Sequence, residues 1–286
     1  MTRLMRIDNL LSRSAAKIQA QTDSDSARID AELLLLNVLC KPRSYLYAHP
    51  ENKLTAEQTA RYALLLERRL GGEPVAYILG KKEFWSLDFE VNSSVLIPRP
   101  DTECLVEFIL NLNLGEDSAV IDLGVGSGAI AIALAHEKAH WRVYGVEYSA
   151  PALHLAQKNA RRLLSSDKLC PPLFLQGNWL HCFAANSFEL VVSNPPYIDG
   201  NDEHLKRGDV RFEPRTALVS NDRGMADIES IATQARQCLK PDGWLVLEHG
   251  FNQAGSVSDL LLSLEYREVK SFCDYAGNQR FSVGRV

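Results

Sequence analysis

The chain has 286 residues, of which 46% are hydrophobic and 23% charged, and its net charge is −5. This composition is typical of a globular protein and excludes a disordered, collagen-like or coiled-coil chain. At ~150 residues per domain, the length predicts two domains or one large one. The longest uncharged stretch near the middle, residues 123–136, has 14 residues. A membrane helix needs ~20. No apolar secretory core follows the N-terminus, so we expect a cytoplasmic protein without a membrane segment.

Charge and cysteine content narrow the class further. Residues 1–80 carry a net charge of +2 and the remainder −7. Neither part has the strongly basic surface of a protein that binds nucleic acid through its phosphates, so we expect no direct nucleic acid binding. The cysteines include no Cys-x-x-Cys pair, and we predict scattered, buried, reduced thiols. They are Cys40, Cys104, Cys170, Cys182, Cys238 and Cys273.

Residues 1–73 are predicted to form a small helical domain. Thr55 and Gln58 fit a capping box, and the helix that follows stops at Gly71-Gly72. A second helix is predicted from about residue 26 to 39, before Pro42. No strand-like alternation interrupts this region.

Residues 74–97 change in character. Residues 75–79, 84–85 and 87–91 are rich in aromatic and branched side chains around Gly80, which predicts short strands. We interpret this segment as a β-hairpin linker. A helix is expected to begin at Asp101, after the Ile-Pro-Arg-Pro segment.

Residues 98–286 alternate between strand and helix patterns. This alternation predicts a Rossmann-like, doubly wound, mostly parallel seven-stranded sheet, in an α/β domain. The last two strands have no helix between them, so we expect them to form an antiparallel hairpin at the end of the sheet. The strands are predicted at 119–122, 142–146, 173–175, 190–193, 244–248, 269–274 and 280–283, and the helices at 129–135, 149–164 and 225–239.

A glycine-rich loop leaves the first of these strands and opens a helix. It reads Asp-Leu-Gly-Val-Gly-Ser-Gly at 122–128, and Glu147 ends the next strand. Glycines let the backbone turn tightly and approach a ligand beside free N–H groups of the helix start. A carboxylate at position 147 can accept both ribose hydroxyls of an adenosine ligand. The loop predicts an adenosine-type cofactor but does not by itself separate NAD from S-adenosylmethionine.

The sequence Asn-Pro-Pro-Tyr at 194–197 follows the fourth strand of the sheet, at the edge where such sheets bind ligands. The Asn194 side chain offers one oxygen acceptor and the Asn194–Pro195 carbonyl another, held by two prolines. Two adjacent acceptors suit a planar NH₂ group, and the Tyr197 ring can lie against its face. Acceptors aimed at the amide hydrogens stabilise the positive charge that methyl transfer places on nitrogen.

Taken together, these residues resemble a known family. The loop at 122–128 followed by Asn-Pro-Pro-Tyr resembles class I S-adenosylmethionine-dependent methyltransferases that act on an exocyclic NH₂. More closely, the chain resembles the protein-(glutamine-N5) methyltransferases of peptide-chain release factors, the HemK or PrmC family. Supporting segments are Glu83-Phe-Trp-Ser86, Leu96-Ile-Pro-Arg-Pro-Asp-Thr-Glu103, Gly208-Asp-Val-Arg-Phe-Glu-Pro214, Gly224-Met-Ala-Asp227 and Leu247-Glu-His-Gly250.

The resemblance implies methylation of the glutamine in the Gly-Gly-Gln loop of class I release factors, a modification that serves translation termination, with S-adenosylmethionine as cofactor. It also implies that the helical domain at residues 1–73 binds the protein substrate, and it implies roles for residues of the site. The glutamine amide would be held by Asn194, Pro195, Pro196 and Tyr197, of which Asn194, Pro195 and Tyr197 are the implied catalytic residues. The implied cofactor-binding residues are Gly124, Val125, Gly126, Ser127, Gly128, Glu147, Asn178, Trp179 and Asn194. The family often has Asp where this chain has Asn178, and Thr is commoner at positions 125 and 127.

Three other functions remain as alternatives. A DNA adenine-N6 methyltransferase shares Asn-Pro-Pro-Tyr but should carry a basic groove. A NAD-dependent oxidoreductase shares the glycine loop but leaves Asn-Pro-Pro-Tyr unexplained. A non-catalytic adenosine-binding module would make Asn194 dispensable. The His-Glu-x-x-His pattern at 136–140 matches zinc proteases. It lies at the end of a helix away from the ligand edge, so we predict a solvated helix end and no metal.

Overall fold

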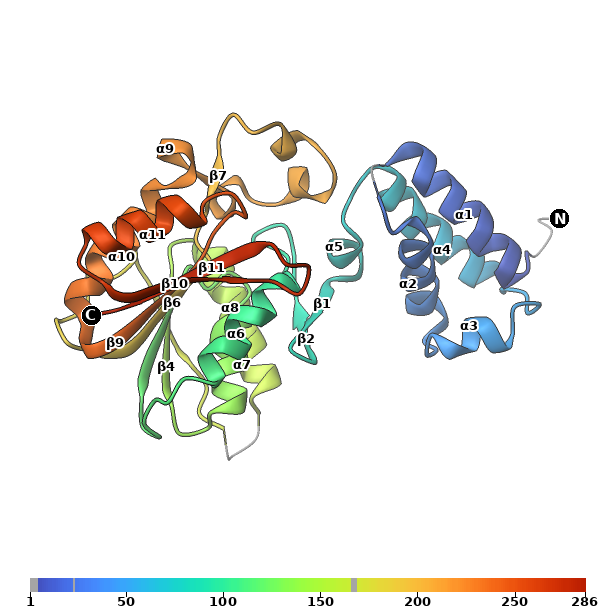
Figure 1. Cartoon of the computed structure of the whole chain (residues 1–286). Coiled ribbons are helices and arrows are strands. Elements are labelled where there is room, and N and C mark those ends of the chain that lie inside the picture. Colours follow the sequence, from blue (N-terminus) through green and yellow to red (C-terminus); the bar gives the residue numbers. More distant parts are fainter. Residues whose placement is uncertain (1–4, 23, 166–168) are drawn as a thin grey trace. The chain divides into compact units, whose positions relative to one another are not determined.

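The computed structural model describes residues 5–22, 24–165 and 169–286, in two compact units (Figure 1). One unit comprises the chain up to Gly80 together with Glu203–Phe212. The other comprises Lys81–Asp202 and Glu213–Val286. The chain therefore leaves the second unit after Asp202, contributes ten residues to the first, and returns.

The first unit is helical. Its core contains apolar side chains of the helices α1, α2 and α4. The predicted capping box is confirmed, because Thr55 Oγ1 accepts from the Gln58 backbone and the Gln58 side chain accepts from the Thr55 backbone. The elements are α1 (Ile7–Gln21), α2 (Ala27–Leu39), α3 (Ser44–Ala48), α4 (Ala56–Leu70), α5 (Val75–Leu79), and the 3₁₀ turns η1 (Glu203–Lys206) and η2 (Asp209–Phe212).

The prediction of a strand at residues 75–79 is wrong, because this segment forms helix α5. Pro74 precedes the helix with its φ fixed at −57°, and its carbonyl accepts the N–H groups of Tyr77 and Ile78. Gly80 ends the helix in the left-handed conformation, with φ at +69°. The proline start and the glycine stop override the strand preference of the aromatic and branched residues between them.

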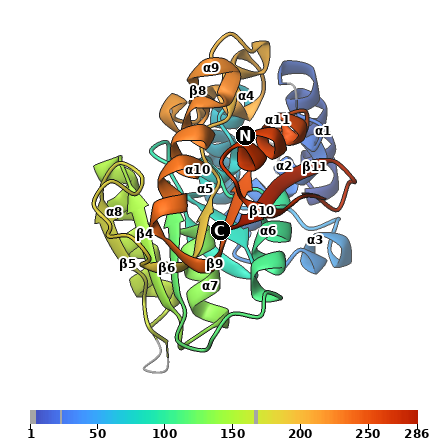
Figure 2. The same cartoon turned by 60° about the vertical axis from the view of Figure 1, so that its left-hand side comes forward.

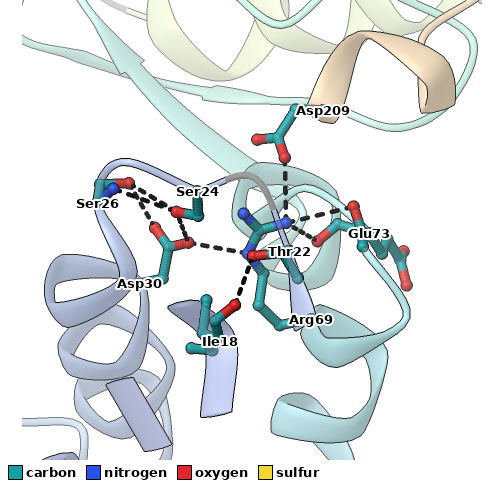
Figure 3. Close-up of polar contacts among 9 residues, drawn as sticks. Ile18, Thr22, Ser24, Ser26, Asp30, Arg69, Glu73 and Asp209 are labelled. Carbon is teal, nitrogen blue, oxygen red and sulfur yellow. Dashed lines mark hydrogen bonds and ion pairs between the residues drawn. The ribbon is translucent and has the colours of Figure 1, made fainter. Parts of the chain in front are cut away.

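A buried arginine on α4 organises the end of the helical unit (Figure 3). Arg69 is 3% exposed, and its Nε lies 2.8 Å from Asp30 Oδ2. Its Nη1 donates to the carbonyls of Gly72 and Glu73 and lies 3.0 Å from Asp209 Oδ1. The guanidinium thus joins α2, the loop after α4 and the segment Glu203–Phe212.

Gly72 allows this segment to approach closely. Its φ is +90°, and a Cβ added there would lie 1.7 Å from Arg211 Nη2 and 3.3 Å from the Phe212 ring. The Arg211 guanidinium lies 5.0 Å from the centre of the Phe212 ring. A side chain at position 72 would displace this pair, so glycine is required by both the turn and the packing.

The second unit begins with the predicted hairpin and contains the predicted sheet. The hairpin is β1 (Lys81–Phe84) and β2 (Leu87–Glu90), joined at Trp85 and Ser86, which both have positive φ. The seven-stranded sheet has the order β10-β11-β9-β6-β3-β4-β5. Its strands are β3 (Ala119–Leu123), β4 (Arg142–Glu147), β5 (Leu173–Gln176), β6 (Phe188–Ser193), β9 (Leu239–Glu248), β10 (Arg267–Cys273) and β11 (Gln279–Arg285).

Five strands, β5, β4, β3, β6 and β9, run parallel, while β11 is antiparallel to both β9 and β10. The Rossmann-like fold and the antiparallel hairpin at the end of the sheet are thereby confirmed. The sequence prediction did not name α11. It also began the strand β9 at residue 244, whereas this strand starts at Leu239 and includes residues 241–243. A register shift against β6 accommodates these residues in the strand.

Helices cover both faces of the sheet (Figures 1 and 2). Val120 of β3 packs with α6 and α7, whereas its neighbour Ile121 packs with α10 and α11, as expected when successive side chains point to opposite faces. The helices are α6 (Asp101–Leu110), α7 (Ala129–Glu137), α8 (Ala150–Leu163), α10 (Ala226–Cys238) and α11 (Ala254–Ser263); smaller elements are β7 (Ile198–Asp199), η3 (Arg215–Ala217), β8 (Val219–Ser220) and α9 (Asn221–Gly224).

The cysteine prediction holds for only two residues. Cys104 and Cys238 are buried thiols on α6 and α10, but the other four are exposed because they lie at element ends, in loops or on the solvent side of a strand. These are Cys40, Cys170, Cys182 and Cys273. Over the described ranges, no helix combines the length and apolar character needed to cross a bilayer.

Candidate active site

A cavity of about 440 Å³ opens at the carboxyl ends of β3, β4 and β6, entirely within the second unit. Gly124, Glu147 and Asn194 each follow or end one of these strands and line it. The edge predicted from the parallel alternation is therefore the edge that is hollow. The lining also includes Val125, Gly126, Ser127, Tyr148, Ser149, Gly177, Asn178, Trp179, Pro196, Arg99, Thr102, Asp122 and Asp227.

The glycine loop has the backbone conformations that glycine permits. Gly124, Gly126 and Gly128 have φ values of +73°, +52° and +86°. A Cβ at Gly128 would lie 2.8 Å from Ile132 Cδ1, and one at Gly124 would lie 3.4 Å from the Trp179 ring. At Gly126, no described atom lies within 4 Å of the added Cβ, so this part of the loop borders open cavity.

Glu147 has a structural contact that the sequence did not reveal. Its Oε2 accepts the Gly126 N–H at 2.9 Å and its Oε1 accepts the Ser149 N–H at 2.9 Å. One carboxylate therefore fixes the middle of the glycine loop and the start of α8. Each oxygen keeps a second acceptor site, so the same side chain can hold ligand hydroxyls.

Among the described residues, Asp122 is a buried group whose hydrogen bonding is incomplete. It is 1% exposed, and its Oδ2 accepts the Ala131 N–H at 3.1 Å. Its Oδ1 has no hydrogen-bond partner among the described residues. Burial raises the pKa of Asp122 to about 7, and the nearby charge of Glu147 adds to the rise. A ligand that brings a cation or a donor to this end of the cavity would supply the missing partner.

Asn194 lines another part of the cavity, next to the hydroxyl group of Thr102 and near the carboxyl group of Glu248. Its Nδ2 donates to Thr102 Oγ1 at 3.3 Å, and Thr102 Oγ1 donates to Glu248 Oε2 at 2.7 Å. Over the described ranges, Asn194 Oδ1 accepts no hydrogen bond. Burial raises the pKa of Glu248 to about 7, against the opposing effect of the Thr102 hydrogen bond. Sequence reasoning assigned no role to Thr102 or Glu248.

The other residues of the Asn-Pro-Pro-Tyr segment differ in whether they line the cavity. Pro196 lines the cavity, whereas Pro195 and Tyr197 are absent from its lining among the described residues. Tyr197 packs against the core on the α10 side of the sheet, and burial raises its pKa further above the ordinary range. Its carbonyl accepts from Gln253 Nε2 at 3.0 Å. Gly224 lies so close that an added Cβ would be 2.0 Å from the Tyr197 carbonyl oxygen.

Two segments noted in the sequence meet at Glu213. Its carboxylate is buried, accepts the Ile97 N–H at 3.2 Å and forms an ion pair with Arg99. Arg99 lines the cavity, so this pair holds part of the cavity wall. By contrast, the His-Glu-x-x-His segment does not form one helical face, because α7 ends at Glu137.

Comparison with known proteins shows relatives that match nearly the whole chain. The family described as the PrmC N-terminal domain matches residues 9–80, and the methyltransferase small domain matches residues 100–211. A protein of Shewanella oneidensis named release factor glutamine methyltransferase is 48% identical over 94% of this chain and 93% of its own. The Escherichia coli K12 protein of the same name is 43% identical over 98% of this chain and 99% of its own.

Among solved structures, a methyltransferase from Pyrococcus furiosus superposes with a TM-score of 0.53 at 17% identity, covering 77% of this chain and 96% of that one. At this identity the likeness concerns the fold alone.

Proposed function

Because the chain belongs to the family of release factor glutamine methyltransferases, we propose that the cavity of the second unit is its active site. The enzyme transfers a methyl group from S-adenosylmethionine to the side-chain amide nitrogen, N5, of the glutamine in the Gly-Gly-Gln loop of class I release factors. The observation that carries this function is identity of 43–48% to such enzymes over nearly the whole chain. We further propose that it acts in the cytoplasm, where release factors work.

The cavity suits the cofactor on two observations of the structure. Asp122 lines the cavity, and its Oδ1 is a buried acceptor without a partner among the described residues, which suits a ligand that carries positive charge. The backbone at Gly126 borders open space. S-adenosylmethionine, when bound, supplies an electrophilic methyl group. We assign its binding to the glycine loop, to Glu147, and to Asn178 and Trp179 on the loop after β5.

The substrate amide is assigned to Asn194 and its neighbours. The Asn194 Oδ1 and the Asn194 backbone carbonyl would accept the two hydrogens of the glutamine NH₂ group. They stabilise the positive charge that develops on nitrogen, and do so more in the transition state than in the ground state. Pro195 and Pro196 restrict the backbone that presents these oxygens.

Tyr197 is assigned to supporting this loop. Its carbonyl is held by Gln253 and its ring is packed against the core, which keeps Asn194 and the prolines in place. Stacking of its ring on the substrate amide, which the sequence predicted, remains a prediction for the complex with substrate.

Labelling distinguishes the candidate reactions. Purified enzyme is incubated with radiolabelled S-adenosylmethionine and one acceptor at a time: a release factor, its Gly-Gly-Gln variant with Gln replaced by Ala, or duplex DNA. We expect label on the unmodified release factor alone. Label on DNA and none on the release factor would contradict the proposal and favour an adenine-N6 methyltransferase.

The helical unit is proposed to bind the protein substrate. This unit supplies a surface separate from the cavity that holds the cofactor, and the net charge of residues 1–80 is opposite in sign to that of the remainder. Crosslinking followed by mass spectrometry tests it. Crosslinks from release factor to lysines of the helical unit are expected, and crosslinks confined to the second unit, residues 81–202 and 213–286, would contradict the assignment.

A further inference from the structure

Thr102 connects the substrate-binding asparagine to a buried carboxylate. Thr102 is the second residue of α6 and is 4% exposed. Its Oγ1 lies 3.3 Å from Asn194 Nδ2 and 2.7 Å from Glu248 Oε2. Asn194 follows β6 and Glu248 ends β9, and these strands are parallel neighbours. Three elements therefore bring one amide, one hydroxyl and one carboxylate into a row.

The chemistry of these groups sets the direction of donation along the two hydrogen bonds of the row. The Thr102 hydroxyl has a single hydrogen, and it donates this hydrogen to Glu248 Oε2. The Thr102 oxygen then has only lone pairs left for Asn194, which must present its Nδ2 rather than its Oδ1. An asparagine amide has no orientation of its own and takes it from such neighbours. The carbonyl oxygen Oδ1 is thus left for a different partner.

We propose that Thr102 and Glu248 are positioning residues for the methyl transfer, which orient the Asn194 amide so that Oδ1 receives the substrate NH₂ group. The inference rests on the proposed function of Asn194 and adds the residues that impose its orientation. With the amide reversed, Nδ2 would face the substrate nitrogen, and two donors would oppose each other. The reversed amide would withhold the acceptor on which stabilisation of the developing charge depends.

The surroundings of Glu248 support a directing role. Glu248 is 1% exposed, and taking a carboxylate out of water costs free energy that an apolar side chain at the end of β9 would avoid. Arg280 and Arg99 favour its charged form, whereas Asp101 opposes it. Two arginines thus act to maintain a carboxylate acceptor at a position where burial disfavours one.

The test separates the hydroxyl from the shape of the side chain. Thr102→Val keeps nearly the same volume but removes the hydroxyl, and Thr102→Ser keeps the hydroxyl. We expect Thr102→Val to lower kcat on release factor by about 10- to 100-fold. Its Kd for S-adenosylmethionine, measured by calorimetry, should stay within about twofold of the original, since the row affects the substrate amide. Thr102→Ser should retain kcat within about threefold.

Glu248→Gln provides a second variant if Thr102→Val fails to fold. Glutamine can accept from or donate to the Thr102 hydroxyl, so the direction of the row is no longer imposed. We expect a smaller fall in kcat, about 3- to 10-fold, with unchanged cofactor affinity.

Each outcome decides between the proposals. Unchanged kcat in Thr102→Val or in Glu248→Gln overturns the positioning role, as does a parallel loss of cofactor affinity or a failure of Thr102→Ser to retain kcat. If Asn194→Ala is inactive while Thr102→Val is fully active, only the positioning role is lost. If the original enzyme does not label the release factor, the proposed function itself fails.

Discussion

Arg69 and Asp209 are 140 residues apart in the chain, and yet Arg69 Nη1 lies 3.0 Å from Asp209 Oδ1 (Figure 3). Arg69 belongs to α4 and Asp209 to the short segment inserted between β7 and β8. The same guanidinium pairs with the buried carboxylate of Asp30. The segment Glu203–Phe212, which follows the loop at residues 194–197 in sequence, is therefore held to α4 by a buried charge.

Arg69→Ala should destabilise the helical unit. The change leaves Asp30 buried without its cation, which costs about 3–5 kcal/mol in the free energy of unfolding. The tryptophans report the second unit alone, since all of them lie there: Trp85, Trp141, Trp179 and Trp244. We expect urea unfolding followed by far-UV circular dichroism to show an early helical transition, while the tryptophan fluorescence transition is little changed.

Asp209→Asn is the matched control for this pair. The Asp209 side chain is 44% exposed, so its ion pair contributes only about 0–1 kcal/mol. We expect its dichroism transition to lie close to that of the original chain. Equal transitions for Arg69→Ala and Asp209→Asn would show that burial of the Asp30 charge does not govern this unit.

Asn194→Ala should abolish turnover and leave cofactor binding largely intact. The change removes the Oδ1 acceptor assigned to the substrate amide but leaves Glu147 and the glycine loop in place. Turnover is measured with radiolabelled S-adenosylmethionine and release factor, and cofactor affinity by calorimetry. An equal collapse of both quantities would show that Asn194 serves the cofactor and not the substrate amide.

Asp122→Asn should flatten part of the dependence of stability on pH. Burial raises the pKa of Asp122 from 3.8 to about 7 in the folded chain. Below pH ~4 both folded and unfolded chains hold the proton. Between pH ~4 and ~7 the unfolded chain releases it and the folded chain keeps it, so this contribution to stability falls as pH rises.

The expected fall is roughly 2–4 kcal/mol in the free energy of unfolding between pH 4 and 7.5, in the original chain relative to the variant. Tryptophan fluorescence during urea unfolding of the ligand-free proteins measures it, because Asp122 lies in the same unit as the tryptophans. A constant difference between the two proteins over this pH range would contradict the assigned pKa rise.

Gly224→Ala should impair turnover by displacing the backbone of the loop at residues 194–197, to which we assign the substrate amide. Gly224 has a φ of +87°, and the added Cβ would lie 2.0 Å from the Tyr197 carbonyl oxygen. The loop that carries Asn194 must shift to make room. We expect kcat on release factor to fall by about tenfold or more, because misplacement of reacting groups by ~1 Å can cost ~100-fold.

Gly255→Ala supplies the comparison for a glycine without this constraint. Gly255 lies in α11, and an added Cβ would meet no described atom within 4 Å. This variant should keep kcat and gain about 0.5–1 kcal/mol in stability, because alanine favours the helix. Similar losses in both variants would refute the role assigned to close backbone approach at Tyr197.

The residues of the cavity that sequence could identify are those that follow strands. The glycine loop, Glu147 and Asn194 come directly after or at the end of predicted parallel strands, whose carboxyl ends share one edge. Thr102 could not be placed beside Asn194 in this way, since their contact joins residues 92 apart and no local pattern encodes it. The same holds for Glu248, which was singled out only as part of a family segment.

The strand preference of individual side chains gave a wrong prediction where a proline and a glycine bound the segment. The segment 75–79 has strand-forming side chains but is bounded by Pro74 and Gly80, which start and stop a helix. Four cysteines that were predicted to be buried are exposed. The prediction failed for them because apolar character alone does not say which side of an element faces solvent. Which side chains of residues 203–212 approach α4 depends on the tertiary fold, and this was beyond sequence reasoning.

The three passages of the chain between its units limit how the protein can be cut. A fragment that begins at Lys81 would retain Glu203–Phe212 but would lose Arg69 and Gly72, which contact these ten residues. The side of this segment that contacts the helical unit would become exposed to solvent in an otherwise intact second unit. A fragment that consists of the second unit alone therefore requires two changes, removal of residues 1–80 and replacement of residues 203–212 by a shorter linker.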